Sequence, residues 1–176
     1  VTRNADITVD EPYGRTFTGS FDGGHHIITI DLHASAGGPV GAWGLFGELD
    51  GAAVKDLRLR GELTVAEDSD VRSLGALAGT VSGDTVIGGC RSEAAVQSEV
   101  SGGSVGGFVG RVTGGTLTMT GCAGAGAVKA LDSAAAGGLV GSLDGGSMTL
   151  TRCYRYGDVL GGLCAGGFVG QLAEQA

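Results

Sequence analysis

The stretch GGFVGRVTGG at 106–115 recurs as GGLVGSLDGG at 137–146. Such a repeat must be sought before single elements are assigned, because a fixed period indicates a repeat architecture. Five segments align around one shared glycine, whose number advances in steps of 32, 31, 31 and 29. These segments are WGLFGEL (43–49), GALAGTV (75–81), GGFVGRV (106–112), GGLVGSL (137–143) and GGFVGQL (166–172), with the glycine at Gly47, Gly79, Gly110, Gly141 and Gly170.

Three cysteines give a second landmark in the same phase. Cys90, Cys122 and Cys153 follow one another in steps of 32 and 31. If each repeat forms one coil, they stack in adjacent coils about 4.8 Å apart. We interpret them as a ladder of buried thiols, because free cysteine packs as a small apolar residue and parallel side chains close a disulfide poorly. Oxidation of an exported chain is the alternative, and Cys164 lies outside the ladder.

Each repeat contains three short extended runs, such as GGFVGRV, TLTMTGC and GAVKAL. Helices are disfavoured, because a glycine in a helix interior costs about 1 kcal/mol. The sequence therefore predicts an all-β fold, a β-solenoid similar to a parallel β-helix. One coil per repeat of about 31 residues is expected, with each strand bonded to its copy in the next coil.

Stacked coils turn equivalent positions into rows. One apolar row and a second row four positions later should face the interior. These rows are Leu45, Leu77, Phe108, Leu139 and Phe168, and Leu49, Val81, Val112, Leu143 and Leu172. The repeated glycine between them would let the backbone approach another wall closely. The row that follows the first, Phe46, Ala78, Val109, Val140 and Val169, is also apolar. Either the strand is bulged at the glycine or its second face is covered.

Composition limits the partners. The 176 residues carry a net charge of −8 and are 42% hydrophobic. Nucleic acids and anionic membranes attract Lys and Arg clusters, so neither is an expected partner, and no apolar run is long enough for membrane insertion. We expect a single domain with an N-terminal opening or capping coil region at 1–42 and a repeat solenoid at 43–176. The abrupt end after GGFVGQLAEQA suggests part of a longer protein.

The chain resembles the GLUG-motif family of bacterial surface proteins. The resemblance rests on the GGLVG and GGFVG cores, on TRCYRYGDV at 151–159 and on FTGSFDGGHHIITIDL at 17–32. Within the last segment, Phe21, Asp22, Gly23, His25 and Ile27 or Ile28 match the opening that often precedes the repeats, although a histidine stands where glycine is more usual. The family includes adhesin-like proteins and non-catalytic regions of immunoglobulin-A-cleaving metallopeptidases.

Metal-ligand residue types gather in and after DGGHH, at Asp22, His25, His26 and Asp31. HExxH and zinc-type Cys/His spacings are missing, so we interpret this segment as a turn that opens the first coil. DGG at 22–24 and at 144–146 likewise fits turns better than calcium loops. We expect no catalytic residue, no cofactor and no metal, and hence no enzyme. All three histidines lie between 25 and 33, so a site that contradicts this expectation belongs there.

The predicted function is a non-catalytic structural or adhesive segment of an exported bacterial protein, secreted or held at the cell surface. It would act as a spacer or bind a host or microbial surface protein or glycan, next to flanking domains of the same chain. One alternative is an accessory region of a secreted surface peptidase. A remote alternative is ice binding, on a face where Thr116, Thr118 and Thr120 lie over Ser147, Thr149 and Thr151. In the preceding coil Asp84, Val86 and Gly88 break this array.

Overall fold

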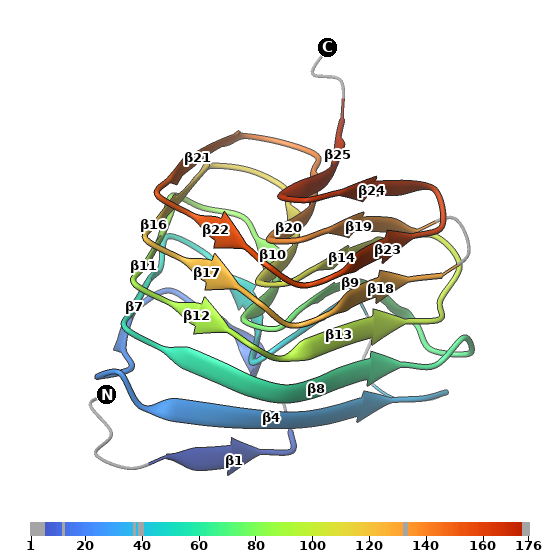
Figure 1. Ribbon diagram of the computed structural model, residues 1–176, viewed down its shortest axis with the longest axis horizontal. Helices are drawn as coiled ribbons and strands as arrows, with labels where there is room; N and C mark the ends of the chain where they lie inside the picture. The colour runs from blue at the N-terminus through green and yellow to red at the C-terminus, as the bar shows by residue number, and fades with distance from the viewer. Residues whose placement is uncertain (1–5, 12, 37, 39–40, 132–133, 174–176) are drawn as a thin grey trace.

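The computed structural model describes residues 6–11, 13–36, 38, 41–131 and 134–173. Within these residues every regular element is a β-strand, and every strand pairs in parallel with its copy in a neighbouring coil. Figure 1 shows the coils stacked upon one another, with β1 at one end and β25 at the other. The predicted all-β parallel solenoid, with one coil for each repeat of the sequence, is confirmed.

Each coil passes in turn through four sheets, numbered here from 1 to 4. Sheet 1 contains β2 (Tyr13–Phe17), β6 (Phe46–Leu49), β10 (Ala78–Val81), β15 (Val109–Val112), β20 (Val140–Leu143) and β25 (Val169–Leu172). Sheet 2 contains β3 (Ser20–Asp22), β7 (Ala53–Lys55), β11 (Thr85–Gly88), β16 (Thr116–Thr120) and β21 (Ser147–Thr151).

Sheet 3 is the broadest, and its strands are divided in two from the third coil onward. It contains β1 (Ile7–Val9), β4 (Ile27–Ala34), β8 (Arg58–Val65), β12 (Arg91–Ser92), β13 (Ala95–Ser98), β17 (Ala123–Gly124), β18 (Val128–Ala130), β22 (Tyr154–Arg155) and β23 (Val159–Gly161). Sheet 4 contains β5 (Gly41–Trp43), β9 (Val71–Gly75), β14 (Ser104–Gly106), β19 (Ala135–Gly137) and β24 (Cys164–Gly166).

The repeated glycine motif forms a corner and not one strand. In GGFVGRV, β14 ends at Gly106 and β15 begins at Val109, so the chain changes direction at Gly107 and Phe108. Phe108 and Val109 are both fully buried, because the alternation of side chains restarts after the corner. The corner therefore explains the second apolar row that strict alternation would place outside.

The predicted interior rows are buried in the inner coils. Leu77, Phe108 and Leu139 are completely inaccessible to solvent, whereas Phe168 of the last described coil is 43% exposed. These side chains belong to one continuous core together with the inward residues of sheets 2 and 3, for example Leu117 on β16. Each inner coil is thus covered by the coils on both sides of it.

The glycines of the motif allow two backbones to touch. A Cβ atom on Gly110 would lie 2.5 Å from the backbone nitrogen of Leu74, and one on Gly141 would lie 2.7 Å from that of Val105. Leu74 and Val105 belong to sheet 4, on the strand one repeat before the strand that leads into each corner. The close approach expected from the sequence is therefore present where sheet 1 passes sheet 4.

A second corner leads from sheet 2 to sheet 3 and uses a left-handed backbone once per coil. The φ angles are 62° at His25, 52° at Asp56, 61° at Gly89, 64° at Gly121 and 52° at Arg152. These five residues are equivalent, since each stands two positions before residues that pair across sheet 3. Three coils thus place a non-glycine residue in a conformation that costs roughly 1–2 kcal/mol.

Candidate functional site

The DGGHH segment is the first of these left-handed corners. Oδ1 of Asp22 accepts a hydrogen bond from the backbone nitrogen of Gly24 at 3.0 Å, and Nζ of Lys55 lies 2.9 Å from Oδ2 of Asp22. The bond from Lys55 has the larger effect and the bond from Gly24 adds to it. Together they hold the pKa of the Asp22 carboxyl below its usual value. The Asp22 carboxylate therefore stabilises the turn.

The two histidines of this corner have different neighbours. The backbone nitrogen of His25 donates to the carbonyl oxygen of Asp56 at 2.7 Å, and its Nδ1 lies 4.0 Å from the Asp56 carboxylate. Nδ1 of His26 lies 3.6 Å from Oδ1 of Asp6. The structure thus does not assemble Asp22, His25 and His26 around one point.

Asp144, in the second DGG segment, has its own partner. Its Oδ2 lies 3.2 Å from Nε of Arg111 on β15, the equivalent strand of the preceding coil. The following Gly146 has a φ of 76° and completes the turn into β21. The carboxylates at the two DGG segments are therefore held by cationic side chains.

The fourth candidate, Asp31, belongs to a cluster that sequence reasoning missed. The atoms of Asp31, His33 and Glu62 that could bind a metal ion lie within 4.8 Å of one another. In the described part of the chain, these three side chains form the one group of potential metal ligands that is this close together. Nε2 of His33 lies 2.8 Å from Oδ1 of Asp31 and 3.8 Å from Oε1 of Glu62. Asp31 and Glu62 are directly paired in the register of β4 and β8, so the signal was their spacing of one repeat.

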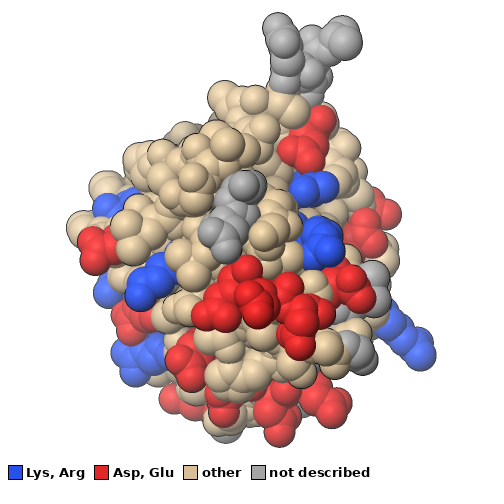
Figure 2. Space-filling model, turned by 90° about the vertical axis from the view of Figure 1, so that its right-hand side faces the viewer, with Lys and Arg blue, Asp and Glu red and all other residues tan. Residues whose placement is uncertain are grey.

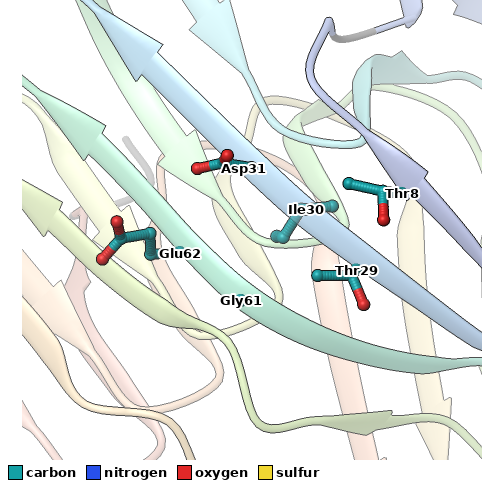
Figure 3. A pocket seen from close by; sticks show the side chains of 6 residues that line it. All are labelled: Thr8, Thr29, Ile30, Asp31, Gly61 and Glu62. Atoms are coloured by element: carbon teal, nitrogen blue, oxygen red, sulfur yellow. The ribbon is translucent and has the colours of Figure 1, made fainter.

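The cluster borders a shallow groove. Thr8, Thr29, Ile30, Asp31, Gly61 and Glu62 line this space of about 400 Å³. Figure 3 shows the Asp31 carboxylate above β4 and the Glu62 carboxylate above the neighbouring β8, with Thr8 on β1 across the groove. Gly61 has a φ of 96°, and a Cβ at this position would collide with the carbonyl oxygen of Ile30 on β4, so glycine is required where the two strands meet. The groove and the cluster together form the outer surface of sheet 3 in the first two coils.

The cysteine ladder has the predicted order. The backbone nitrogen of Ala123 donates to the carbonyl oxygen of Cys90, and that of Tyr154 donates to Cys122, so Cys122 lies between Cys90 and Cys153. All three are free thiols; Cys90 and Cys122 are buried and Cys153 is partly exposed. Contact with Cys122 and burial raise the pKa of the Cys90 thiol. These thiols therefore pack as part of the core.

Cys164 lies apart from this ladder, as expected. It belongs to β24 in sheet 4, where it pairs with Ala135 of the preceding coil. It is a free, partly exposed thiol.

The hydroxyl array on sheet 2 has the predicted register. Thr116 pairs with Ser147, Thr118 with Thr149, and Thr120 with Thr151. Oγ of Ser147 donates to Oγ1 of Thr116 at 3.1 Å. In the preceding coil Val86 pairs with Thr118 and Gly88 with Thr120, so the array covers two coils.

Acidic side chains gather where the chain passes from sheet 3 to sheet 4. Figure 2 shows this side of the molecule, on which acidic groups form a larger patch than basic ones. The turn between β8 and β9 contributes Glu67, Asp68 and Asp70, all exposed. A polyanion would be repelled from this face.

Comparisons with family models, curated proteins and solved structures give no match to this chain. Among the described residues there is no helix that is long and apolar enough to span a membrane. The parallel sheets and the repeated coil define the class of the chain, which is a β-solenoid repeat protein.

Proposed function

We propose that this chain is a non-catalytic segment of an exported bacterial surface protein. It acts as a rigid spacer and presents its polar side surfaces to a protein or glycan of a host or microbial cell. The motifs that resemble the GLUG family support this assignment, and so does the solenoid, which suits a structural role.

The observation that carries the proposal is the register between coils, which sheet 1 keeps without a shift from β6 to β25. In sheet 1, Phe46 pairs with Ala78, Ala78 with Val109, Val109 with Val140, and Val140 with Val169. Such a ladder fixes each coil on the previous one and resists bending of the stack. Repetition also places similar surfaces at regular intervals, which suits attachment to repeated groups.

Sheet 3 is the surface best suited to binding. On β8 the outward positions carry Arg60, Glu62 and Thr64, while Leu59 and Leu63 are buried. Gln97 continues this polar surface in the next coil, where it pairs with Thr64. Hydrogen-bonding and charged groups of this kind recognise glycan hydroxyls or a polar protein surface.

A binding screen tests the proposal. The purified chain is applied to immobilised glycans and to intact host and microbial cells, alongside an Arg60→Ala/Gln97→Ala variant and a matched Thr118→Ala/Thr149→Ala variant on sheet 2. We expect saturable binding that the sheet 3 variant weakens at least tenfold and the sheet 2 variant leaves unchanged. Absence of binding to every surface, or hydrolysis of peptides or glycans by the chain, contradicts the proposal.

The peptidase alternative gives this segment the same non-catalytic role within a different protein. A metal-binding HExxH sequence elsewhere in the full-length chain would favour it. Sequencing the gene on both sides of the region that encodes these residues distinguishes the two contexts.

Ice binding is a second candidate because the hydroxyl array is in register. Thr118 and Thr149 lie at paired positions, with Thr120 and Thr151 beside them. Within the described residues the array is two coils wide, because Val86 and Gly88 interrupt it on β11. Ice-recrystallisation assays test this function, and a Thr118→Lys variant with the same activity as the unchanged chain would exclude the array as the binding face.

A further inference from the structure

Three side chains that can ligate a metal converge on the outer face of sheet 3. Asp31 and His33 occupy alternate outward positions of β4, and Glu62 pairs directly with Asp31 on β8. All three are exposed, with side-chain exposures between 55% and 59%. Two carboxylates held side by side on paired strands repel each other unless a cation lies between them.

The nearest arginine on this face does not neutralise the two acids. Nε of Arg60, two residues before Glu62, lies 2.8 Å from Oε2 of Glu93 in the next coil. Oε1 of Glu93 lies 2.6 Å from Nε of Arg91, so the Glu93 carboxylate is held between Arg60 and Arg91. Asp31 and Glu62 instead share His33 as a neighbour, since Nε2 of this imidazole lies 2.8 Å from Asp31 and 3.8 Å from Glu62.

The imidazole is oriented from its other nitrogen. Nδ1 of His33 forms a short hydrogen bond with Oγ1 of Thr64, the residue that pairs with His33 across the strands. Nε2 of His33 donates to Oδ1 of Asp31 at 2.8 Å, because a carboxylate only accepts. A bound cation would displace that proton, and Nδ1 would then carry the proton and donate it to the Thr64 hydroxyl, which turns the lone pair of Nε2 toward the ion. A hydrogen bond at the second nitrogen is the usual way in which a metal-binding histidine is held.

We propose that Asp31, His33 and Glu62 bind a divalent transition-metal cation of the Zn²⁺ type. A tetrahedral ion about 2.1 Å from each ligand sets the ligand atoms about 3.4 Å apart. The separations of 2.8 Å and 3.8 Å from Nε2 to the two carboxylate oxygens bracket that value. Small rotations of exposed side chains therefore bring the three atoms to coordination distance.

Three protein ligands leave one position of a tetrahedral ion open. That position faces solvent beside the groove lined by Thr8, Thr29 and Gly61. Water, or a carboxylate of a bound molecule, fills it. The mixed nitrogen and oxygen set selects Zn²⁺ over Ca²⁺ and Mg²⁺, which prefer six or more oxygen ligands or retain their water.

This site differs from the expectation of a metal-free chain, which rested on spacings within one segment. It does not depend on the adhesive role, because the ligands are defined by their geometry alone. Zn²⁺ binding with no cell or glycan binding would leave the inference intact, and the converse would leave the proposed function intact.

Titration with zinc chloride, followed in amide ¹H–¹⁵N NMR spectra, tests the inference. The solution contains a thiol-free reductant, so that Cys153 and Cys164 stay reduced. We expect saturable shifts confined to residues 29–35 and 60–66, and no such shifts with calcium or magnesium chloride at the same concentration. Shifts centred on the cysteines, equal shifts with Ca²⁺, or no shifts at millimolar zinc overturn it.

Three variants locate the ligands. His33→Ala should weaken zinc binding at least tenfold and Glu62→Gln about tenfold, because each removes one ligand without removing buried surface. His25→Ala is the matched control, since His25 is an exposed histidine of the same coil outside the cluster. Unchanged affinity in His33→Ala, or an equal loss in His25→Ala, overturns the assignment.

Discussion

Replacing Gly110 by alanine should destabilise the solenoid strongly, although it adds a single methyl group. That Cβ would lie 2.5 Å from the nitrogen of Leu74, 2.6 Å from the carbonyl oxygen of Gly79 and 2.8 Å from the carbonyl carbon of Ser73. All three are backbone atoms, so no side chain can rotate away. The backbones must instead separate by roughly 1 Å to reach ordinary contact at about 3.5–4.0 Å.

The expected loss follows from that displacement. Overpacking by one methylene in a well-packed core costs about 1–3 kcal/mol. The upper end applies here, because the shift also stretches hydrogen bonds between β10, β15 and β20. For a chain of this length, a loss of about 3 kcal/mol lowers the melting temperature by about 6–12 °C.

Urea and thermal denaturation, followed by circular dichroism of the strands, measure this loss. Gly88→Ala is the matched control, because a Cβ on Gly88 meets nothing within 4 Å and its φ is not positive. We expect the control to be neutral or stabilised by about 0.4–1 kcal/mol. If both variants melt at the same temperature, backbone contact is not the reason for the repeated glycine.

Three further outcomes follow from burial and charge. Leu117→Ala should destabilise the fold by about 2–5 kcal/mol, because the Leu117 side chain is completely buried. Leu160 is 55% exposed, so Leu160→Ala should change the stability by less than about 0.5 kcal/mol, and denaturant melts measure both variants. A thiol reagent should label two of the four cysteines quickly in the native chain and all four in urea, since Cys90 and Cys122 are buried; rapid native labelling of three would contradict the ladder packing. Because the folded-state pKa of Asp22 is lowered, its contribution is present above about pH 4 and is lost as the pH falls through the lowered value, so Asp22→Asn should flatten the acid limb of a stability profile.

The period of the sequence predicted the coil and its stacking because it is a property of the whole chain. The motif glycines, such as Gly110, and the cysteines, such as Cys122, recur with the same period. This period placed equivalent residues in neighbouring coils, and the pairing of Val109 with Val140 confirms it. The corner at Gly107 and Phe108 was not predicted. Alternation of apolar residues cannot distinguish a bulge from a change of direction when both leave successive side chains buried.

The cluster on sheet 3 was missed for a different reason. Asp31 and Glu62 lie in different coils, so a search for ligands at short spacing separates them. Aligning the first coil with the second, one repeat apart, would have placed them together and His33 beside Thr64. The orientation of these side chains and the 2.8 Å contact between His33 and Asp31 depend on rotamers, which no spacing specifies.

The direction of the hydrogen bonds between coils has a mechanical consequence. They run along the stack, from one coil to the next, and β1 and β25 lie at opposite ends of it (Figure 1). A pull on the two ends therefore loads the bonds of one outer coil before those of the next, as in opening a zip fastener. Each inner coil is hydrogen-bonded to a coil on both sides. In the last described coil the side chains of Phe168 and Leu172 are 43% and 67% exposed. Under tension the molecule should yield one coil at a time, from an outer coil inward, so its resistance to force depends on the weakest coil and not on their number.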